Sequence, residues 1–554
     1  MSDGRPSRPS LNATRYAPVK VLSTPHNGQP TSNVIQTQAG KSISTVQHVD
    51  QELDNDEAWE DISYLMPLPK DPVSSYQELL TSMVTALDDE HQNNLLWESE
   101  IWFDANDYGD EALSYHDGVD SSTMQSKIVK PRSGAPRLSF CKMESLYSRG
   151  LSVDPLHYLP IYPSVQNGEL FKLFVNLISK YVVSLDGNPS PNYYNNTWVP
   201  RAMRSRLLSH MAMFTSACYQ AEAQRVPALQ SPVATSFKVK SITLLNEMLS
   251  DRKMATSDET ITAVVYFITN EWYWGITNMV KEHLKGLQEI VRLRGGVDVP
   301  GLTPFVRKMI ILCDYHIACT YDKELCFKHT LSSLPPRYPL HLNTPLLPSE
   351  TPFATISSAL NITQETALLL DDMRFLTNAV IHQTKHPFTE NSHLKFTTTA
   401  AWIRDRIAAL PEETPPPSIL SSSTTISPNP HIYTTVLLAS RIYVSSILIH
   451  TPLSESCTLA DLNRIWNTMW RVTLTQWKSI PGIFIWVLLV ILQASRGREH
   501  GRLVKSMLKA ACYLVAVGQA GEDGLDEVGW AVVEGALERW VGVTAWMREG
   551  RGVI

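Results

Sequence analysis

Cysteine is scarce in this 554-residue sequence, which has seven cysteines and no pair with CxxC spacing. An odd number of cysteines without such pairs is typical of reduced thiols in a cytosolic or nuclear protein and argues against a disulfide framework. The first cysteine is Cys141. The preceding sequence therefore contains none of the thiolate ligands on which cysteine-rich zinc sites depend.

Long hydrophobic runs are also absent. The longest, IFIWVLLVIL (483–492), has ten residues, about half of what a helix needs to cross a bilayer. We therefore interpret it as a buried helix and expect no association with a membrane. The opening stretch MSDGRPSRPSLNATRY lacks the apolar core of a secretion signal, which predicts an intracellular protein.

The motifs of common catalytic sites are missing as well. The sequence contains no GxSxG elbow, HExxH pair, P-loop or GxGxxG turn. We therefore predict that the protein is not an enzyme and uses no cofactor.

Basic residues are few in the N-terminal region. Residues 1–130 contain 8 Lys and Arg against 21 Asp and Glu, whereas residues 131–554 contain 40 against 34. The net charge of −7 therefore comes from the N-terminal region. The weak positive balance of the remainder does not predict a nucleic-acid surface.

Composition divides the chain into four parts. Residues 1–65 are rich in Ser, Thr, Asn, Gln and Pro, which predicts disorder. Residues 66–130 form an acidic-aromatic segment, and residues 131–165 form a linker that contains proline. Residues 166–549 are expected to form one helical domain, interrupted at 411–430 by a disordered insertion.

The acidic-aromatic segment includes the stretch LLWESEIWFDANDYGDEALSY (95–115). Acids keep large apolar side chains hydrated in such a segment, which can then dock as a transient helix into an apolar groove of a partner. Two interpretations stay open, an activation segment that contacts a coactivator and a short helix that packs its aromatic face onto the helical domain. The candidate contact residues are Leu96, Trp97, Ile101, Trp102 and Phe103.

Apolar residues recur at helical spacing from about Gly168 onward, for example in ELFKLFVNLISKYVVSL (169–185) and DETITAVVYFITNEWYWG (258–275). Strand signals are few, and no alternation of strands with helices appears. We predict an all-α fold, an extended array of roughly a dozen helices without a short-period repeat.

One predicted helix, HLKGLQEIVRLRGG (283–296), contains an unexpected glycine. Gly286 costs about 1 kcal/mol relative to alanine in a helix, and we expect the close approach of another helix to offset this. Gly295 and Gly296 predict a left-handed stop at the C-terminus of the helix. We interpret His283 as a structural histidine that bridges neighbouring helices.

The stretch WYWGITNMVKEHLKGLQEIVRLRGG (272–296) resembles the signature of the fungal-specific transcription factor domain, the helical regulatory region that usually follows a zinc binuclear cluster. A second stretch, IPGIFIWVLLVILQASRGREHGRLVKSMLKAA (480–511), resembles the late Pro-Gly…Trp helix of that family. The helix at 305–319 takes the place of the intervening helix that carries an aspartate, and the resemblance spans about 170–545. The motif residues are Trp272, Trp274, His283, Leu284, Gly286, Gly295, Gly296, Pro481, Gly482 and Trp486.

In that family the module that reads DNA is a cysteine-rich cluster with two zinc ions, and this sequence has no cysteine before Cys141. Either an upstream segment is missing from the sequence, or the protein works without reading DNA through a zinc cluster. We expect that the chain as given does not bind DNA specifically by itself and carries no zinc cluster.

The resemblance implies a nuclear transcriptional regulator whose helical domain forms homodimers or heterodimers with related regulators and senses a small molecule or holds a partner. The alternative is an interaction module that does not bind DNA and that sequesters a related zinc-cluster regulator. A helical enzyme is a third hypothesis.

Two groups of residues are candidates for a metal site or a catalytic site. Cys313, His316, Cys319, Cys326 and His329 are of the types that bind zinc, but without a CxxC pair we interpret them as ordinary buried residues.

The pair Asp371-Asp372 is similar to the aspartate pairs of class I terpene synthases, but Phe375 stands where a third carboxylate is needed. We therefore interpret this acid pair as part of a solvated helix face.

Overall fold

The computed structural model describes residues 159–550, apart from 276, 386–389, 413–427 and 518–526. Every described residue belongs to one compact unit of the chain. The described residues form helices joined by turns and irregular segments, with no strand among them, so the predicted all-α fold is confirmed. The predictions for residues 1–130, for most of the linker and for most of the 411–430 insertion concern residues outside the described ranges.

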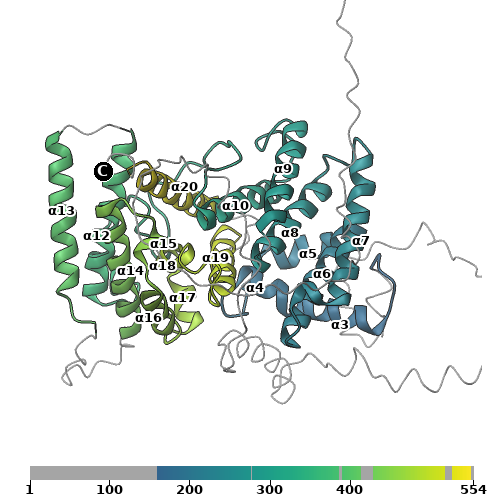
Figure 1. The fold of residues 1–554 in the computed structure, drawn as a ribbon, viewed down its shortest axis with the longest axis horizontal. Coiled ribbons are helices and arrows are strands. Elements are labelled where there is room, and N and C mark those ends of the chain that lie inside the picture. The colour runs from purple at the N-terminus through teal and green to yellow at the C-terminus, as the bar shows by residue number, and fades with distance from the viewer. Residues whose placement is uncertain (1–158, 276, 386–389, 413–427, 518–526, 551–554) are drawn as a thin grey trace, which may run out of the picture. The chain divides into compact units, whose positions relative to one another are not determined.

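The helices follow one another closely along the chain (Figure 1). Residues 332–352 are largely irregular, as their prolines predict. In chain order the helices are α3 (Val165–Leu173), η4 (Phe174–Ile178), α4 (Ser179–Val183), η5 (Tyr194–Trp198), α5 (Val199–Ala202), α6 (Arg206–Ala223), η6 (Ala228–Gln230), α7 (Pro232–Ser250), α8 (Asp258–Trp274), α9 (Thr277–Arg294), α10 (Pro304–Tyr321), η7 (Leu340–Leu342), α11 (Phe353–Ile356), α12 (Gln364–Lys385), α13 (Glu390–Ala408), α14 (Pro430–Ile449), α15 (Leu453–Ser456), α16 (Leu459–Met469), α17 (Leu474–Ser479), α18 (Pro481–Leu492), α19 (Gly501–Ala516) and α20 (Glu527–Glu549).

Side chains that accept backbone hydrogen bonds set the starts of several helices. Ser205, Ser231 and Ser257 each accept an N–H from the first turn of α6, α7 and α8. Thr458 and Thr473 form reciprocal capping boxes at α16 and α17. Each such cap satisfies a donor that the helix itself leaves unpaired, which is typically worth about 1 kcal/mol.

Helix α18 lies in the core, and all of its residues are buried. A helix that is apolar on every side has no face that suits water, so the interpretation of 483–492 as a buried helix is confirmed. It packs against α14, α17, α19 and η7. Helix α14 is long and apolar enough to cross a membrane, but 72% of its apolar window is buried inside the protein, as expected of a core helix.

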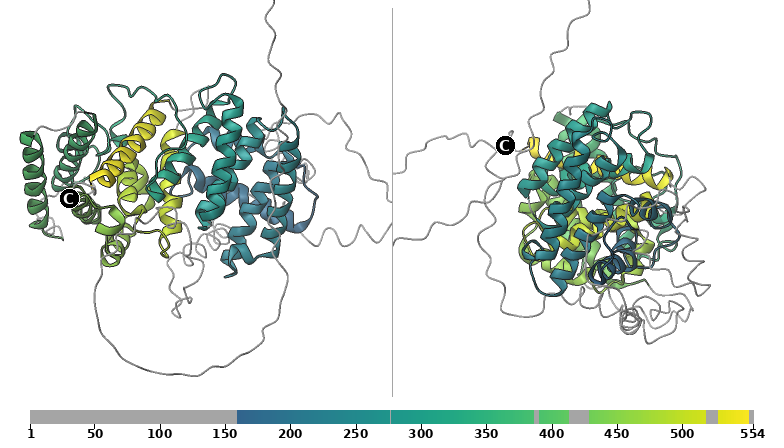
Figure 2. Two further views of the ribbon diagram at one scale, coloured as in Figure 1. Left: turned by 45° about the horizontal axis from the view of Figure 1, so that its top comes forward. Right: turned by 90° about the vertical axis from the view of Figure 1, so that its right-hand side faces the viewer.

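Helix α19 joins the two halves of the helical array. It packs against α4 and α8 on one side and against α18 and α20 on the other. In Figures 1 and 2 it lies between the teal and blue helices of the first half and the green helices of the second. The amphipathic sequence of α19 buries apolar side chains together with one basic side chain, that of Lys505.

Candidate functional site

The motif that carries the family resemblance forms a helix hairpin of α8 and α9. Gly275 ends α8 with a φ of 85°, and Gly295 and Gly296 end α9 with φ values of 109° and 112°. The N–H of Gly296 donates to the carbonyl oxygen of Val291 over 2.9 Å, as in a Schellman stop. The predicted left-handed end of the helix is therefore confirmed.

The expectation for Gly286 is wrong. This glycine is exposed, and a Cβ placed on it would have no atom of another element within 4 Å. No helix approaches Gly286, because the apolar stripe that α9 turns towards α8 is formed by other residues, among them Val280, Leu287 and Val291. Nothing in the described structure compensates for its low helix propensity.

The hairpin also contains the predicted structural histidine. The His283 ring stacks on Phe267 of α8 with ring centroids 5.2 Å apart, and burial lowers its pKa to about 4. His283 is therefore neutral at physiological pH and packs as an aromatic ring between the two helices. Its neighbour Leu284 also packs against the core.

Trp272 links three helices from within the core. Its indole N–H donates to Thr320 Oγ1 over 2.9 Å, and its ring stacks on His316 of α10 at 5.4 Å. Lys505 of α19 donates to the Trp272 carbonyl oxygen over 2.6 Å. Trp274, partly buried, lies edge-on to Tyr219 and Tyr273. These contacts give both tryptophans a packing role.

The second motif, Pro481-Gly482…Trp486, needs its glycine for a steric reason. A Cβ on Gly482 would lie 2.5 Å from the carbonyl oxygen of Asn343 and would also clash with that of Leu342. Pro481 occupies the first turn of α18, where its missing N–H costs nothing. Trp486 is fully buried and lies edge-on to Tyr443 of α14, with centroids 6.0 Å apart. This motif therefore allows the backbone at the start of α18 to contact the backbone of the irregular segment that contains η7.

The candidate zinc ligands do not form one site. His316 stacks on Trp272, whereas His329 lies beside Glu534 of α20. Burial raises the pKa of the Cys313 and Cys326 thiols to about 12 and that of Cys319 as well, which disfavours the thiolate that binds metal. Across the described ranges, no group of three or more His, Cys, Asp or Glu side chains could hold a metal ion.

The interpretation of Asp371 and Asp372 as a solvated face is wrong. Both residues are partly buried. Asp371 accepts the N–H groups of Phe353 and Ala354 over 2.8 and 3.0 Å, which caps the start of α11. Asp372 pairs with Arg406 of α13. The two carboxylates hold the neighbouring elements in place.

A cavity of about 130 Å³ lies between the helices of the first half and α19. Its walls come from η4, α4, η5, α6, α8, α19 and the turn between α16 and α17. Most of its wall is apolar or aromatic, and the residues include Phe174, Tyr181, Tyr219, Tyr266, Trp272 and Met507. A concave, mostly apolar pocket with a few polar groups is the usual form of a small-molecule site.

Among the described residues that line this cavity, Lys509 is the single charged one, and no Asp or Glu is found with it. Its ammonium lies 5.8 Å from the ring centre of Tyr513, and no ion pair joins it to a carboxylate within the described part of the chain. Burial lowers the pKa of Lys509 to about 8. Lys509 is not among the residues predicted from the sequence, although its position among the apolar residues of LVKSMLKAACYLV is a detectable signal.

The polar groups next to Lys509 in the cavity wall are mostly satisfied by the protein. Asn270 donates to the carbonyl oxygen of Tyr266, Thr269 to that of Val265, and Thr215 to that of Met211. Ser184 donates to Asp186, outside the cavity wall. Lys509 therefore remains the charged group that a guest in the cavity can use.

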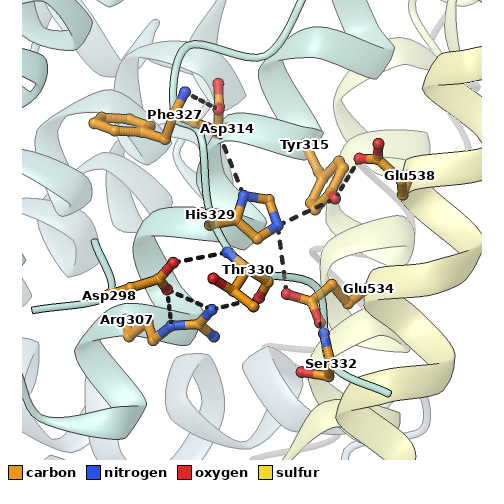
Figure 3. Close-up of polar contacts among 10 residues, drawn as sticks. All are labelled: Asp298, Arg307, Asp314, Tyr315, Phe327, His329, Thr330, Ser332, Glu534 and Glu538. Carbon is orange, nitrogen blue, oxygen red and sulfur yellow. Dashed lines mark hydrogen bonds and ion pairs between the residues drawn. The ribbon is translucent and has the colours of Figure 1, made fainter. Parts of the chain in front are cut away.

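A second polar group of residues, here called the polar joint, ties the segment after α10 to α10 and α20 (Figure 3). Asp314 accepts the N–H groups of Cys326 and Phe327 over 3.0 and 2.9 Å. Farther along the segment, the N–H of Ser332 donates to Glu534 over 2.7 Å. The polar joint consists of Asp298, Arg307, Asp314, Tyr315, Phe327, His329, Thr330, Ser332, Glu534 and Glu538.

Charge complementarity inside the polar joint sets the protonation of its central pair. His329 Nε2 lies 3.4 Å from Glu534 Oε1. Burial by itself lowers the pKa of His329, but the Glu534 carboxylate and the Phe327 carbonyl outweigh it and raise the pKa. Burial raises the pKa of Glu534, but hydrogen bonds from His329 and Ser332 bring it below its usual value. The arrangement is a buried ion pair that tethers a loop.

The comparisons with known proteins give one match. The family model described as the fungal specific transcription factor domain matches residues 169–516, more than half of the chain. The matched range contains both motifs and every residue that lines the cavity. No curated protein and no solved structure matches the chain.

Proposed function

Because the chain belongs to the fungal specific transcription factor domain family, we propose that it acts in the nucleus as a regulator of fungal genes. The family gives the chain a role in transcription regulation. The observation that carries the proposal is the match over residues 169–516, which is long enough to include the whole array from α4 to α19.

The acidic-aromatic segment supplies the proposed contact with the transcription machinery. Residues 1–130 hold 21 acids against 8 bases, and large apolar residues alternate with acids around Trp97 and Trp102. Such a segment docks its apolar side chains into a groove of a coactivator, while the acids keep it hydrated before binding. The helical domain then restrains or presents this segment.

A tethered reporter tests this division of labour. Residues 1–554, 1–130 and 131–554 are each fused to an unrelated DNA-binding domain in a fungal host, and reporter transcription is measured. The proposal expects 1–130 to activate and 131–554 not to activate. A matched pair of full-length fusions carries alanine at Trp97, Trp102 and Phe103 or, as control, asparagine or glutamine at Glu98, Glu100 and Asp104.

Loss of activation in the aromatic variant, with a smaller loss in the acid variant, supports docking through the rings. If 1–130 stays silent in every fusion, the activation role of the segment is refuted. A fluorescently tagged chain tests the nuclear assignment separately. A tagged chain that is confined to the cytosol, together with an unchanged transcriptome after deletion of the gene, would refute the regulator role.

A second candidate function is favoured by the cysteine distribution. Since no cysteine precedes Cys141 in this sequence, we infer a protein that works without reading DNA through a zinc cluster of its own. It would then bind a related zinc-cluster regulator as a heterodimer and sequester it. Affinity capture of the tagged full chain from a fungal lysate tests this, and recovery of a cluster-bearing regulator is the expected result.

Self-association distinguishes the two candidates further. The regulator hypothesis expects homodimers or heterodimers of the helical domain. Light scattering of the purified full chain measures the homodimer directly. A strict monomer that also captures no related regulator would refute both forms of dimerisation.

A further inference from the structure

We propose that the cavity beside α19 is a binding site for a small aromatic carboxylate, with Lys509 as the group that receives the carboxylate. This goes beyond the proposed function and does not depend on it, because binding is measured on the purified protein. Three features of the cavity carry the inference: its size, the character of its wall and the position of its single charge.

The size of the cavity limits the ligand to about one ring. Its volume is about 130 Å³, and a protein cavity of about 150 Å³ is known to hold benzene. The space therefore matches a single ring, and a larger ligand would extend beyond it.

The wall selects an aromatic guest. Tyr181, Tyr219, Tyr266, Trp272 and Tyr273 all line the cavity. Aromatic pairs in offset or edge-on arrangements gain roughly 0.5–1.5 kcal/mol beyond the apolar area that they bury. A flat ring inside this wall can make several such contacts at once, whereas a small polar molecule would give up its hydration without a comparable return.

The charge selects an anion. Lys509 lines the cavity, and no Asp or Glu appears among the residues described as lining it. The Ser184, Thr215, Thr269 and Asn270 side chains already donate to protein acceptors. A carboxylate in the cavity would accept from the lysine ammonium in surroundings where a charge-assisted hydrogen bond is strong.

Lys505 does not compete for this role. It lies one turn earlier on the same helix and is buried, but its ammonium donates to the carbonyl oxygen of Trp272 over 2.6 Å and lies 5.5 Å from the Trp272 ring centre. It is absent from the cavity wall. One lysine therefore supports the backbone of α8, and the other is left to the cavity.

Isothermal titration of the purified full chain with benzoate tests the proposal, with benzamide as the neutral ligand of similar size. Benzoate should bind, and benzamide should bind more weakly by roughly ten- to hundredfold, which is the range for one hydrogen bond to a charged group. Lys509→Met should bring benzoate down to the level of benzamide. Lys180→Met is the matched control, because Lys180 is an exposed residue on α4, which also contributes to the cavity wall.

Ser506→Phe provides an independent variant, since it fills the cavity from the same helix. It should abolish binding of both ligands. Tryptophan fluorescence gives a second measurement, because a bound ligand should quench the lining residues Trp272 and Trp470 in the wild type and not in this variant. If Lys509→Met does not fold, as judged by circular dichroism, Lys509→Gln replaces it. The proposal is overturned if benzoate fails to bind at millimolar concentration, or if a folded Lys509 variant keeps the preference for benzoate over benzamide.

Discussion

Gly482 and Asn343 are so close that a Cβ on the glycine would lie 2.5 Å from the asparagine carbonyl oxygen. Real Cβ atoms essentially never come so near to a backbone oxygen. The start of α18 can therefore pack in the core only because Gly482 has no side chain. Gly286, in the other motif, has open space at the same position, so the two motif glycines have opposite structural roles.

We predict that Gly482→Ala destabilises the protein by about 1–3 kcal/mol, the usual cost of forcing extra atoms into a packed interior. The control Gly286→Ala makes the same chemical change and should stabilise it by up to about 1 kcal/mol, because alanine is the better helix former. Urea unfolding of both variants measures the difference. Equal effects of the two substitutions would contradict the steric assignment.

The last turn of α9 contains two arginines with different surroundings. Arg294 pairs with Asp258 at 2.7 Å and donates to the carbonyl oxygen of Gly301 over 2.8 Å, with 18% of its side chain exposed. Arg292 pairs with Glu289 and is 68% exposed. The contacts of Arg294 with Asp258 of α8 and with Gly301 join α9 to other elements, whereas Glu289, the ion-pair partner of Arg292, lies on α9 itself.

Arg294→Ala should therefore lower the free energy of unfolding by roughly 1–3 kcal/mol, since it leaves partners without a donor. Arg292→Ala should lower it by no more than about 0.5 kcal/mol, as is usual for an exposed pair within one helix. Chemical unfolding of the two variants under identical conditions compares them. A larger loss for Arg292→Ala would refute the stabilising role assigned to the Arg294 contacts.

The polar joint should make stability depend on pH. The raised pKa of His329 means that its contribution is fully present below about pH 6.5 and disappears as the pH rises through the folded-state value. The lowered pKa of Glu534 means that its contribution is present above about pH 4.5 and disappears as the pH falls through its folded-state value. The pair therefore stabilises the fold most between these two limits.

His329→Gln should remove the part of the stability that is lost above about pH 6.5. Thermal unfolding of wild type and variant between pH 6 and pH 8 measures this. The difference between the two proteins should shrink as the pH rises. A constant difference across this range would mean that His329 acts only through packing.

Affinity for benzoate should also fall as the pH rises through the pKa of Lys509, which burial lowers to about 8. The thiol of Cys313 and the ring of His316 both interact with this lysine, but their pKa values of about 12 and about 3 keep them neutral in this range. Tyr513, whose ring lies beside the ammonium, has a pKa raised by burial and also stays neutral. Titration at pH 6 and pH 9 compares the affinities.

Lys505 supplies the control for this pH dependence, because burial lowers its pKa to about 8 as well. Lys509→Met retains Lys505. The residual binding of this variant should therefore be insensitive to pH. If the variant still loses affinity between pH 6 and pH 9, the titrating group is Lys505 or another residue outside the cavity wall.

Features whose physical cause lies in neighbouring residues could be predicted from the sequence alone. The unbroken apolar run 483–492 has no polar face, so it could only be a buried helix. Gly295 and Gly296 follow a helix and adopt positive φ at little cost. The predicted left-handed end of α9 therefore agrees with the structure at both residues. The all-α class followed from the same local periodicity.

Only the tertiary structure decided what depends on segments far apart in the chain. Gly482 meets the backbone near η7, about 140 residues earlier, and Asp371 caps a helix that starts at Phe353. Neither contact has a local sequence signal, and the same lack of signal led to the wrong expectation for Gly286. The cavity is assembled from helices between residues 174 and 510. Among the residues described as lining the cavity, no carboxylate accompanies Lys509. This arrangement is a property of packing, and no single stretch of the sequence predicts it.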